Sequence, residues 1–319
     1  MKLSIIIPCY NVELYIERCI LSCAMQSPYI STDYEIVIID DGSIDGSMRI
    51  AEDIQKKYPH LIRLHSQKNQ GLSIARNVGL ELARGKYVWF VDSDDWIEPN
   101  CLQQIIPLLD NEEVDLLQLQ YRLAYDDSLL NCQVKRYWFE GILTGKEVMR
   151  RGGLPAPAQF TIARKHFLEE NDVKFMAGIY HEDVEFKPRA TYLASKIVCL
   201  DKICYNYYQR LSGSITSNFK MKNAVDIITV ANSLYLFAQS VPSNERFYFY
   251  YTLSMNMNSL FYECKKLGSS DFQKIKQMLY NQRNIYKAMI LSRNLKYMFE
   301  GIFLLLNVDL GLWIYRILK

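Results

Sequence analysis

The chain has 319 residues, of which 50% are hydrophobic and 23% are charged. These proportions are those of an ordinary globular protein, and the length suffices for one large domain or two smaller ones with buried cores. The eight cysteines form no CxxC pair, which argues against a zinc site and favours the reduced, mostly buried thiols of a cytosolic protein.

The formal net charge of +2 is distributed unevenly along the chain. Residues 260–319 contain ten Lys or Arg and four Asp or Glu, a net charge of +6, so residues 1–259 carry a net charge of −4. A basic segment rich in Tyr, Phe and Leu is compatible with an anionic membrane, with nucleic acid or with a solvated helix face. The solvated face is the commonest of these, and we expect no nucleic-acid partner.

The first hundred residues alternate between apolar runs of strand length and stretches of helical periodicity. The first run ends at Pro8 and is too short for a signal peptide, so we expect it to be a strand. The expected strands are residues 3–7, 35–39, 61–65 and 87–91, and the expected helices are residues 12–26, 47–58 and 72–83. Nearly continuous apolar strands separated by single helices predict a parallel sheet covered on both faces.

Polar segments follow three of these strands directly, namely Pro8–Asn11, Asp40–Ser43 and Asp92–Asp95. Parallel sheets bind ligands at the carboxyl ends of their strands, where we expect these segments to meet. Carboxylates this close together repel one another unless a cation reduces the repulsion. Oxygen ligands suit Mg²⁺ or Mn²⁺, which take their further ligands from phosphate. A solvated acidic turn is commoner in general, but two acidic pairs at matching strand ends favour a site for metal and diphosphate.

The rest of the chain is less regular and then becomes helical. Short strands are expected at residues 116–121 and 197–200, and helical periodicity runs from Lys222 to the end. We therefore place a domain boundary near residue 220. Neither a GxGxxG fingerprint nor a P-loop is present, so a nucleotide would be held by carboxylates, metal and backbone instead.

Four segments, taken together and in order, resemble the motifs of the family 2 inverting glycosyltransferases of GT-A fold. They are Ser4–Asn11, Glu35–Ser43, Gly71–Asn77 and Val91–Asp95, and Glu182–Asp183 is similar to the family's later acidic motif. The resemblance implies an α/β fold, with a Rossmann-like, mostly parallel sheet flanked by helices. On this basis residues 1–220 form a GT-A catalytic domain and residues 221–319 form a C-terminal helical region.

The resemblance also implies a nucleotide pocket at the first two strand ends. Pro8, Tyr10 and Asn11 would line the base and the ribose, with the ring of Tyr10 near the base. Asp41 is similar in position to the aspartate that accepts a hydrogen bond from N3–H of uracil. Without the resemblance, Tyr10 would be a packing aromatic and Asp41 a turn residue before Gly42.

Asp92 and Asp94 match the family's DxD element. By the resemblance, Asp92 lies near the ribose and the metal, and Asp94 is the direct ligand of Mn²⁺ or Mg²⁺. Asp95 is expected to be a helix N-cap or a residue behind the ligands. Arg76 would bind the nucleotide through the diphosphate or pair with a DxD carboxylate, and a purely structural role is equally compatible with the sequence.

The acceptor hydroxyl needs a base, because its pKa lies far above neutrality. Asp183 matches the family's catalytic base, so we assign it that role. The local sequence alone also fits an acidic pair that complements a helix dipole. The segment from Tyr205 to Ile215 resembles the family's closing segment, which would bring Arg210 or Ser214 near phosphate.

The resemblance implies a metal-dependent enzyme that moves one sugar from a nucleotide-diphosphate sugar to a hydroxyl of a glycan or lipid-linked acceptor. Uridine is the favoured base of the donor. Such reactions occur in cell-surface polysaccharide synthesis. The QxxRW element of processive members is missing, so we expect one sugar per visit. A sugar nucleotidyltransferase would carry a glycine-rich loop after the first strand. A catalytically silent carbohydrate- or nucleotide-binding scaffold would have lost acidic motif residues, and this chain retains them.

The apolar residues 297–318 are interrupted by Glu300, Asn307 and Asp309, so they predict a poor spanning helix. Their composition suits an interfacial helix, which would place the enzyme in the cytoplasm, peripherally at the cytoplasmic face of the membrane. A helix packed on the catalytic domain or on a second copy of the chain fits equally well, which leaves a homo-oligomer open.

Overall fold

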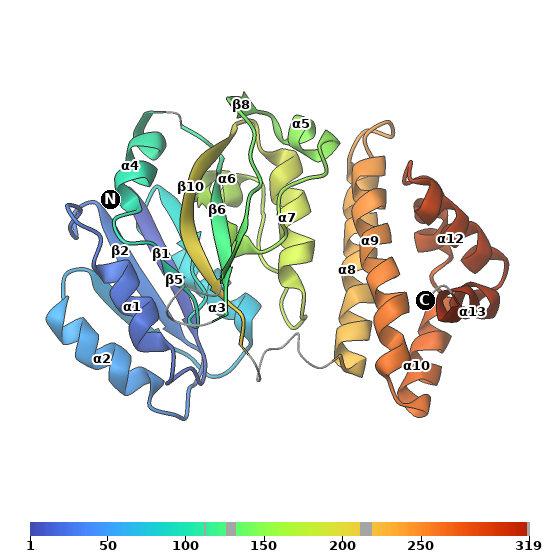
Figure 1. Cartoon of the computed structure of the whole chain (residues 1–319), viewed down its shortest axis with the longest axis horizontal. Helices are drawn as coiled ribbons and strands as arrows, with labels where there is room; N and C mark the ends of the chain where they lie inside the picture. Colours follow the sequence, from blue (N-terminus) through green and yellow to red (C-terminus); the bar gives the residue numbers. More distant parts are fainter. Residues whose placement is uncertain (112, 126–131, 211–218, 318–319) are drawn as a thin grey trace. The chain divides into compact units, whose positions relative to one another are not determined.

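The computed structural model describes residues 1–111, 113–125, 132–210 and 219–317 (Figure 1). The chain forms two compact units. The first consists of Met1–Gly178 and Ala190–Arg210, and the second of Ile179–Arg189 and Leu211–Lys319. The assignment of the catalytic function to residues 1–220 stays a prediction.

The first unit is built on one sheet, in which ten strands are described. Its strand order is β3-β2-β1-β4-β9-β6-β10-β5, with β7 paired to β6 and β8 paired to β10. The strands are β1 (Leu3–Cys9), β2 (Tyr34–Asp40), β3 (Ile62–Ser66), β4 (Tyr87–Phe90), β5 (Trp96–Ile97), β6 (Leu116–Ala124), β7 (Cys132–Lys135), β8 (Ile142–Leu143), β9 (Thr161–Arg164) and β10 (Ile197–Tyr208).

The half of the sheet from β3 to β4 is parallel, as predicted. β1 pairs with β2 and β4, and β2 pairs with β3, all in parallel register. The register aligns Cys9 with Asp40, so the segments that follow β1 and β2 begin at the same edge of the sheet. The mostly parallel α/β fold expected from the sequence is confirmed.

The other half is mixed. β9 runs antiparallel to both β4 and β6, β10 runs parallel to β6, and β5 runs antiparallel to β10. β10 extends well beyond the predicted residues 197–200, because Tyr205 and Asn206 are fully buried and pair with β5. This extension carries β10 toward the segment that follows β4.

Helices cover both faces of the parallel half (Figure 1). They are α1 (Ile16–Ala24), α2 (Ser47–Lys57) and α3 (Leu72–Leu82), followed in this unit by α4 (Leu102–Asn111), α5 (Gly145–Arg150) and α6 (Lys165–Glu170). Ile5 of β1 shares a core cluster with Ile20 of α1. Ile6 points the other way, to α3, where a Cβ on Gly79 would lie 2.2 Å from Ile6 Cγ2. Burial on both faces explains the continuous apolar run of β1.

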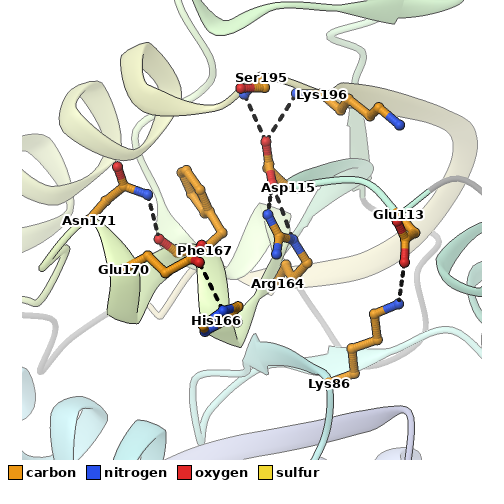
Figure 2. A network of polar contacts seen from close by, with 10 residues as sticks. All are labelled: Lys86, Glu113, Asp115, Arg164, His166, Phe167, Glu170, Asn171, Ser195 and Lys196. Carbon is orange, nitrogen blue, oxygen red and sulfur yellow. Dashed lines mark hydrogen bonds and ion pairs between the residues drawn. The ribbon is translucent and has the colours of Figure 1, made fainter.

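The amino ends of β6 and β10 are fixed to β9 by one buried carboxylate, Asp115 (Figure 2). The Asp115 carboxylate accepts hydrogen bonds from Arg164 Nη2 at 2.5 Å and Arg164 Nε at 3.2 Å. It also accepts the backbone N–H groups of Ser195 and Lys196 at 2.7 and 3.1 Å. Asp115 thus joins three strands far from the ends that carry the acidic segments.

The second unit is helical, as the periodicity from Lys222 predicts. Its helices are α8 (Met221–Ser240), α9 (Phe247–Glu263), α10 (Ser269–Tyr280), α11 (Arg283–Ile290), α12 (Leu295–Leu306) and α13 (Val308–Ile317), and α7 (Glu182–Leu193) begins in it. The segment expected as one interrupted helix is two, divided at Asn307. Among the described residues, none of the helices has both the length and the apolar character needed to cross a membrane.

The Asp115 cluster generates a prediction about stability. Asp115→Asn turns an acceptor into a partial donor facing Arg164 and two N–H groups, so the free energy of unfolding should fall by about 2–3 kcal/mol. Chemical denaturation measures this value. The control is Glu113→Gln, which removes the exposed Lys86–Glu113 pair seen beside it in Figure 2. The control should change stability by less than about 0.5 kcal/mol, and equal losses in both variants would contradict the assignment.

Candidate active site

The loops that follow β1 and β2 are tied together. The N–H of Asn11 donates to Ser43 Oγ at 3.1 Å, and the N–H of Ile44 donates to Asn11 Oδ1 at 2.9 Å. Asn11 has φ 51°, a left-handed conformation that asparagine tolerates better than most residues. Gly42 has φ 80°, and a Cβ there would lie 3.1 Å from the backbone nitrogen of Asn69. Asn11 and Gly42 therefore suit the backbone of these two loops, which together are called the rim below.

Pro8 and Tyr10 differ in exposure. Pro8 is buried in β1 and aligned with Ile39 of β2. Tyr10 lies just beyond the strand and is 49% exposed. An aromatic ring left half uncovered can stack on a flat base. The structure brings both residues to the same strand end as Asn11, and their contact with a base stays a prediction.

Asp41 is buried and holds the loop that leads into α3. Its Oδ1 accepts from Gln67 Nε2 at 2.7 Å and from the N–H of Gln70 at 2.9 Å, and its Oδ2 accepts the N–H of Gly71 at 2.7 Å. A carboxylate offers about four acceptor positions, so these three bonds leave room for one more donor on Oδ2. That is compatible with the predicted bond from N3–H of uracil.

Asp92 follows β4 closely and faces the guanidinium of Arg76 on α3. Arg76 Nη2 donates to Asp92 Oδ1 at 2.7 Å, and the Arg76 side chain is only 1% exposed. The guanidinium carbon also lies 5.1 Å from the centre of the Phe175 ring. A guanidinium buried this deeply requires a carboxylate. This pairing is one of the roles that the sequence predicts for Arg76, and a contact with diphosphate stays a prediction.

Asp94 faces a second guanidinium. Arg210 Nε lies 2.7 Å from Asp94 Oδ2, and the guanidinium carbon lies 4.4 Å from the centre of the Tyr15 ring. Burial and the neighbouring Asp92 charge raise the pKa of Asp94, while Arg210 lowers it. Burial and the neighbouring Asp92 therefore disfavour the negative charge of Asp94. Ser214, the other predicted phosphate contact, lies outside the described residues.

Of the two roles expected for Asp95, that of a helix N-cap is wrong, because Asp95 is fully buried and strand β5 follows it. Its Oδ2 accepts the hydroxyl proton of Tyr205 at 2.6 Å, and its Oδ1 accepts the N–H of Tyr208 at 2.7 Å. The Tyr205 oxygen in turn accepts the N–H of Asp92 at 3.1 Å. Burial, followed by the charges of Asp94 and Asp92, raises the pKa of Asp95. Asp95 thus fixes the DxD segment to β10.

Arg18 of α1 is a site residue that the sequence reasoning missed. Its Nη2 donates to the backbone oxygen of Asp94 at 2.8 Å. Its guanidinium carbon lies 3.8 Å from the centre of the Trp96 ring and 4.8 Å from that of Tyr208. The only signal in the sequence is a cation on a helix that follows the first strand, which is too common a feature to single out Arg18.

Asp183 lies in the first turn of α7, in the second unit, half-buried beside the buried Glu182. One turn later, Lys187 is only 2% exposed. Burial lowers the pKa of Lys187 to about 7, and the Asp183 charge opposes this shift. The same segment is bound to α8, since the N–H of Tyr180 donates to Asp226 at 2.8 Å. The role of Asp183 as base stays a prediction that rests on the resemblance.

The two DxD carboxylates fit a hard divalent cation that is only partly held by protein. Within the described ranges, no group of three or more His, Cys, Asp and Glu side chains is placed to hold a metal ion. Mg²⁺ in particular is commonly bound by one or two carboxylates together with substrate phosphates and water. Asp92 and Asp94 are the residues that would bind it, and burial together with the Asp92 charge raises the pKa of Asp94.

Solved structures define the class of fold. Residues 1–349 of Staphylococcus aureus TarS, in complex with UDP-GlcNAc, match with a TM-score of 0.77 and 22% identity, over 99% of this chain and 90% of that one. The mannosyltransferase PcManGT from Pyrobaculum calidifontis, in complex with GDP-Man and Mn²⁺, matches with a TM-score of 0.54 and 13% identity, over 97% and 88% of the two chains. The fold is that of the GT-A enzymes, as predicted.

Sequence comparison then gives the family. The sequence model described as Glycosyl transferase family 2 matches residues 4–170, more than half of the chain. The chain belongs to this family, as the resemblance implied. It is 33% identical over 216 residues to the uncharacterized glycosyltransferase YibD of Escherichia coli and 31% identical over 232 residues to the putative glycosyltransferase EpsH of Bacillus subtilis. These matches cover 65% and 69% of this chain but only 61% and 64% of the relatives, less than two thirds of their length.

The contacts of Tyr205 generate a second prediction. Tyr205→Phe removes the hydroxyl between Asp95 and the N–H of Asp92, leaving both groups without this partner in a buried place. The free energy of unfolding should fall by about 1–3 kcal/mol, as measured by chemical denaturation. The matched control, Tyr10→Phe, removes a hydroxyl from a half-exposed ring and should leave stability unchanged. A Tyr205 variant as stable as wild type would mean that this hydroxyl does not hold the DxD segment.

Proposed function

We propose that the protein is an inverting, metal-dependent glycosyltransferase that moves one sugar from a UDP-sugar to a hydroxyl group of a glycan or lipid-linked acceptor. The observation that carries this proposal is the pair of carboxylates after β4, Asp92 and Asp94, each 2.7 Å from a guanidinium. After β2, at the same edge of the sheet, Asp41 has one acceptor position left. These groups match what a uracil ring, a divalent cation and a diphosphate require.

Relatives support the choice of donor. One solved structure of TarS holds UDP-GlcNAc and another holds UDP. TarS is a poly(ribitol-phosphate) beta-N-acetylglucosaminyltransferase, and it is 29% identical to this chain over 219 residues, which are 68% of this chain and 37% of TarS. The two structures agree with a uridine donor, and the name of TarS agrees with a polymeric acceptor.

The nucleotide would be oriented at the first two strand ends. Asp41 would accept N3–H of the base through its remaining position on Oδ2, and the half-exposed ring of Tyr10 would stack on the base. Asn11 would hold the rim against which the ribose lies. Because Asp41 already bonds Gln70 and Gly71, binding requires no movement of this carboxylate, which lowers the entropic cost of binding.

Breaking the bond between sugar and phosphate leaves extra negative charge on the departing UDP. Mn²⁺ or Mg²⁺ held by Asp92 and Asp94 would supply a Lewis acid that neutralises this charge. Arg76 holds the Asp92 carboxylate in place through its hydrogen bond of 2.7 Å. Arg210 stacks on Tyr15 at the end of β10, where its guanidinium is available to phosphate oxygens as well as to Asp94.

Attack by the acceptor requires that its hydroxyl lose a proton. We assign this proton to the Asp183 carboxylate, which would take it as the oxygen bonds to the anomeric carbon from the face opposite UDP, inverting that centre. The half-buried Asp183 lies one turn from the buried Lys187, and the Asp183 charge opposes the lowering of the Lys187 pKa by burial. An ionised carboxylate is the form that a base needs.

We place the reaction in the cytoplasm, at a glycan or lipid-linked acceptor presented at the cytoplasmic face of the membrane. All eight cysteines are free in the structure, and the majority are buried. Free thiols are typical of a reducing compartment. The cytoplasm is also where we expect nucleotide sugars to be available to this site.

Nucleotide and metal should stabilise the protein together. A ligand that binds only the folded state at about 100 times its Kd adds about 2.7 kcal/mol, so UDP with Mn²⁺ should raise the melting temperature and a chelator should abolish the rise. Asp94→Asn should abolish it too, while the control Asp53→Asn, an exposed carboxylate on α2, should retain it. A rise that is the same in the Asp94 variant would contradict the proposed metal site.

Asp183→Asn separates an enzyme from a silent binding protein. Loss of a general base lowers kcat about 10²- to 10⁴-fold, whereas the stabilisation by UDP and Mn²⁺ should persist. Release of UDP from a UDP-sugar, with and without acceptors, measures the rate. The matched control is Asp271→Asn, an exposed acid in the first turn of α10. If Asp183→Asn lowers stability but not kcat, Asp183 stabilises the first turn of α7 and is not the base. If wild type never releases UDP, the protein is not a transferase.

A further inference from the structure

Helix α12 exposes an apolar face. Leu295, Phe299, Phe303 and Leu306 are 71%, 54%, 37% and 75% exposed. At about 100° per residue, these four positions lie within one arc of roughly 80°. Ile302, between them, is partly exposed. Scattered exposed apolar residues are normal on a protein surface, but a continuous stripe along one helix marks an interaction surface.

Packing on α11 determines which face of α12 points outward. Gly301 is buried, and a Cβ there would lie 2.7 Å from the carbonyl oxygen of Tyr286. Leu304, on the same side, is 1% exposed. The start of the helix is also fixed, since the N–H of Tyr297 donates to Asn294 Oδ1 at 3.3 Å. The exposed stripe therefore belongs to a well-packed helix and cannot be buried by rotating it.

Lysines and a tyrosine border this stripe. The ammonium groups of Lys265 and Lys296 lie 5.1 and 5.8 Å from the centre of the Tyr262 ring, and that ring is 39% exposed. Tyr262 is on α9, against which α12 packs in the second unit (Figure 1). Tyrosine and lysine combine an apolar body with a polar tip, which suits the level of lipid headgroups.

The charge around the stripe is positive. Residues 283–317 contain five Lys or Arg and only two acids, Glu300 and Asp309. Glu300 accepts from Asn258 Nδ2 at 3.0 Å, and Asp309 pairs with Lys276 and accepts from the hydroxyl of Tyr280. Both acids are thus engaged within the unit. An apolar stripe in a basic setting is complementary to an apolar surface that carries negative charge.

We propose that the exposed face of α12 docks on an anionic lipid bilayer, with Phe299 and Leu306 entering the boundary between headgroups and acyl chains. A second copy of the chain would also bury the stripe, but it would bring two basic surfaces together. Anionic lipid is instead attracted by the net positive charge of residues 283–317. This surface is independent of the donor site, so the proposal goes beyond the transferase function and does not rest on it.

Vesicle binding tests the proposal on the full chain without any nucleotide. Wild type should sediment with vesicles of phosphatidylcholine and phosphatidylglycerol in equal parts, and bind far less to pure phosphatidylcholine or at high salt. Phe299→Ser and Leu306→Ser should each weaken binding about tenfold, because each removes one buried apolar side chain. Lys265→Gln should weaken it about fivefold.

The control variant is Leu236→Ser, on α8 of the same unit, which is 68% exposed and should bind as wild type does. The proposal is overturned if wild type does not bind, if the α12 variants bind as wild type does, or if Leu236→Ser is equally impaired. It is also overturned if sedimentation shows a dimer that Phe299→Ser dissociates while no vesicles are bound. Circular dichroism and the melting temperature of each variant show whether weaker vesicle binding comes from the changed surface or from unfolding.

Discussion

The structure depends on holding three carboxylates close together after one strand. Asp92, Asp94 and Asp95 repel one another. Burial, together with this repulsion, raises the pKa of Asp94 and that of Asp95. Asp92 and Asp94 each face a guanidinium, that of Arg76 or Arg210. Asp95 is held by hydroxyl and N–H donors of β10. These partners stabilise the three carboxylates but do not remove the repulsion among them. A cation that arrives with a diphosphate would therefore bind favourably there.

This constraint explains why β10 is long. Its buried end carries Tyr205 and Tyr208, whose bonds to Asp95 connect the DxD segment to the mixed half of the sheet. The opposite end of the same strand begins next to Lys196, whose N–H is held by Asp115 (Figure 2). One strand thus connects the Asp115 cluster at one end to the acidic segment at the other.

Much of the parallel half was predictable, because fully buried strands have continuous apolar runs and their ends identify the site. β5 and β9 escaped prediction because they have only two and four residues, too few to show periodicity. Arg18 and Tyr205 escaped it because their contacts span 76 and 110 residues of sequence. The basic, apolar tail was evident, but only packing against Tyr286 shows which face of α12 stays exposed.

The position of Mn²⁺ in crystals grown with UDP tests the central claim most directly, since anomalous scattering locates the ion independently of any assumed role. The account predicts one strong peak at direct metal–oxygen distance, about 2 Å, from the Asp94 carboxylate, close to Asp92 and to the diphosphate. A manganese peak bound to UDP but remote from both carboxylates, or no peak in crystals that contain UDP, would contradict it.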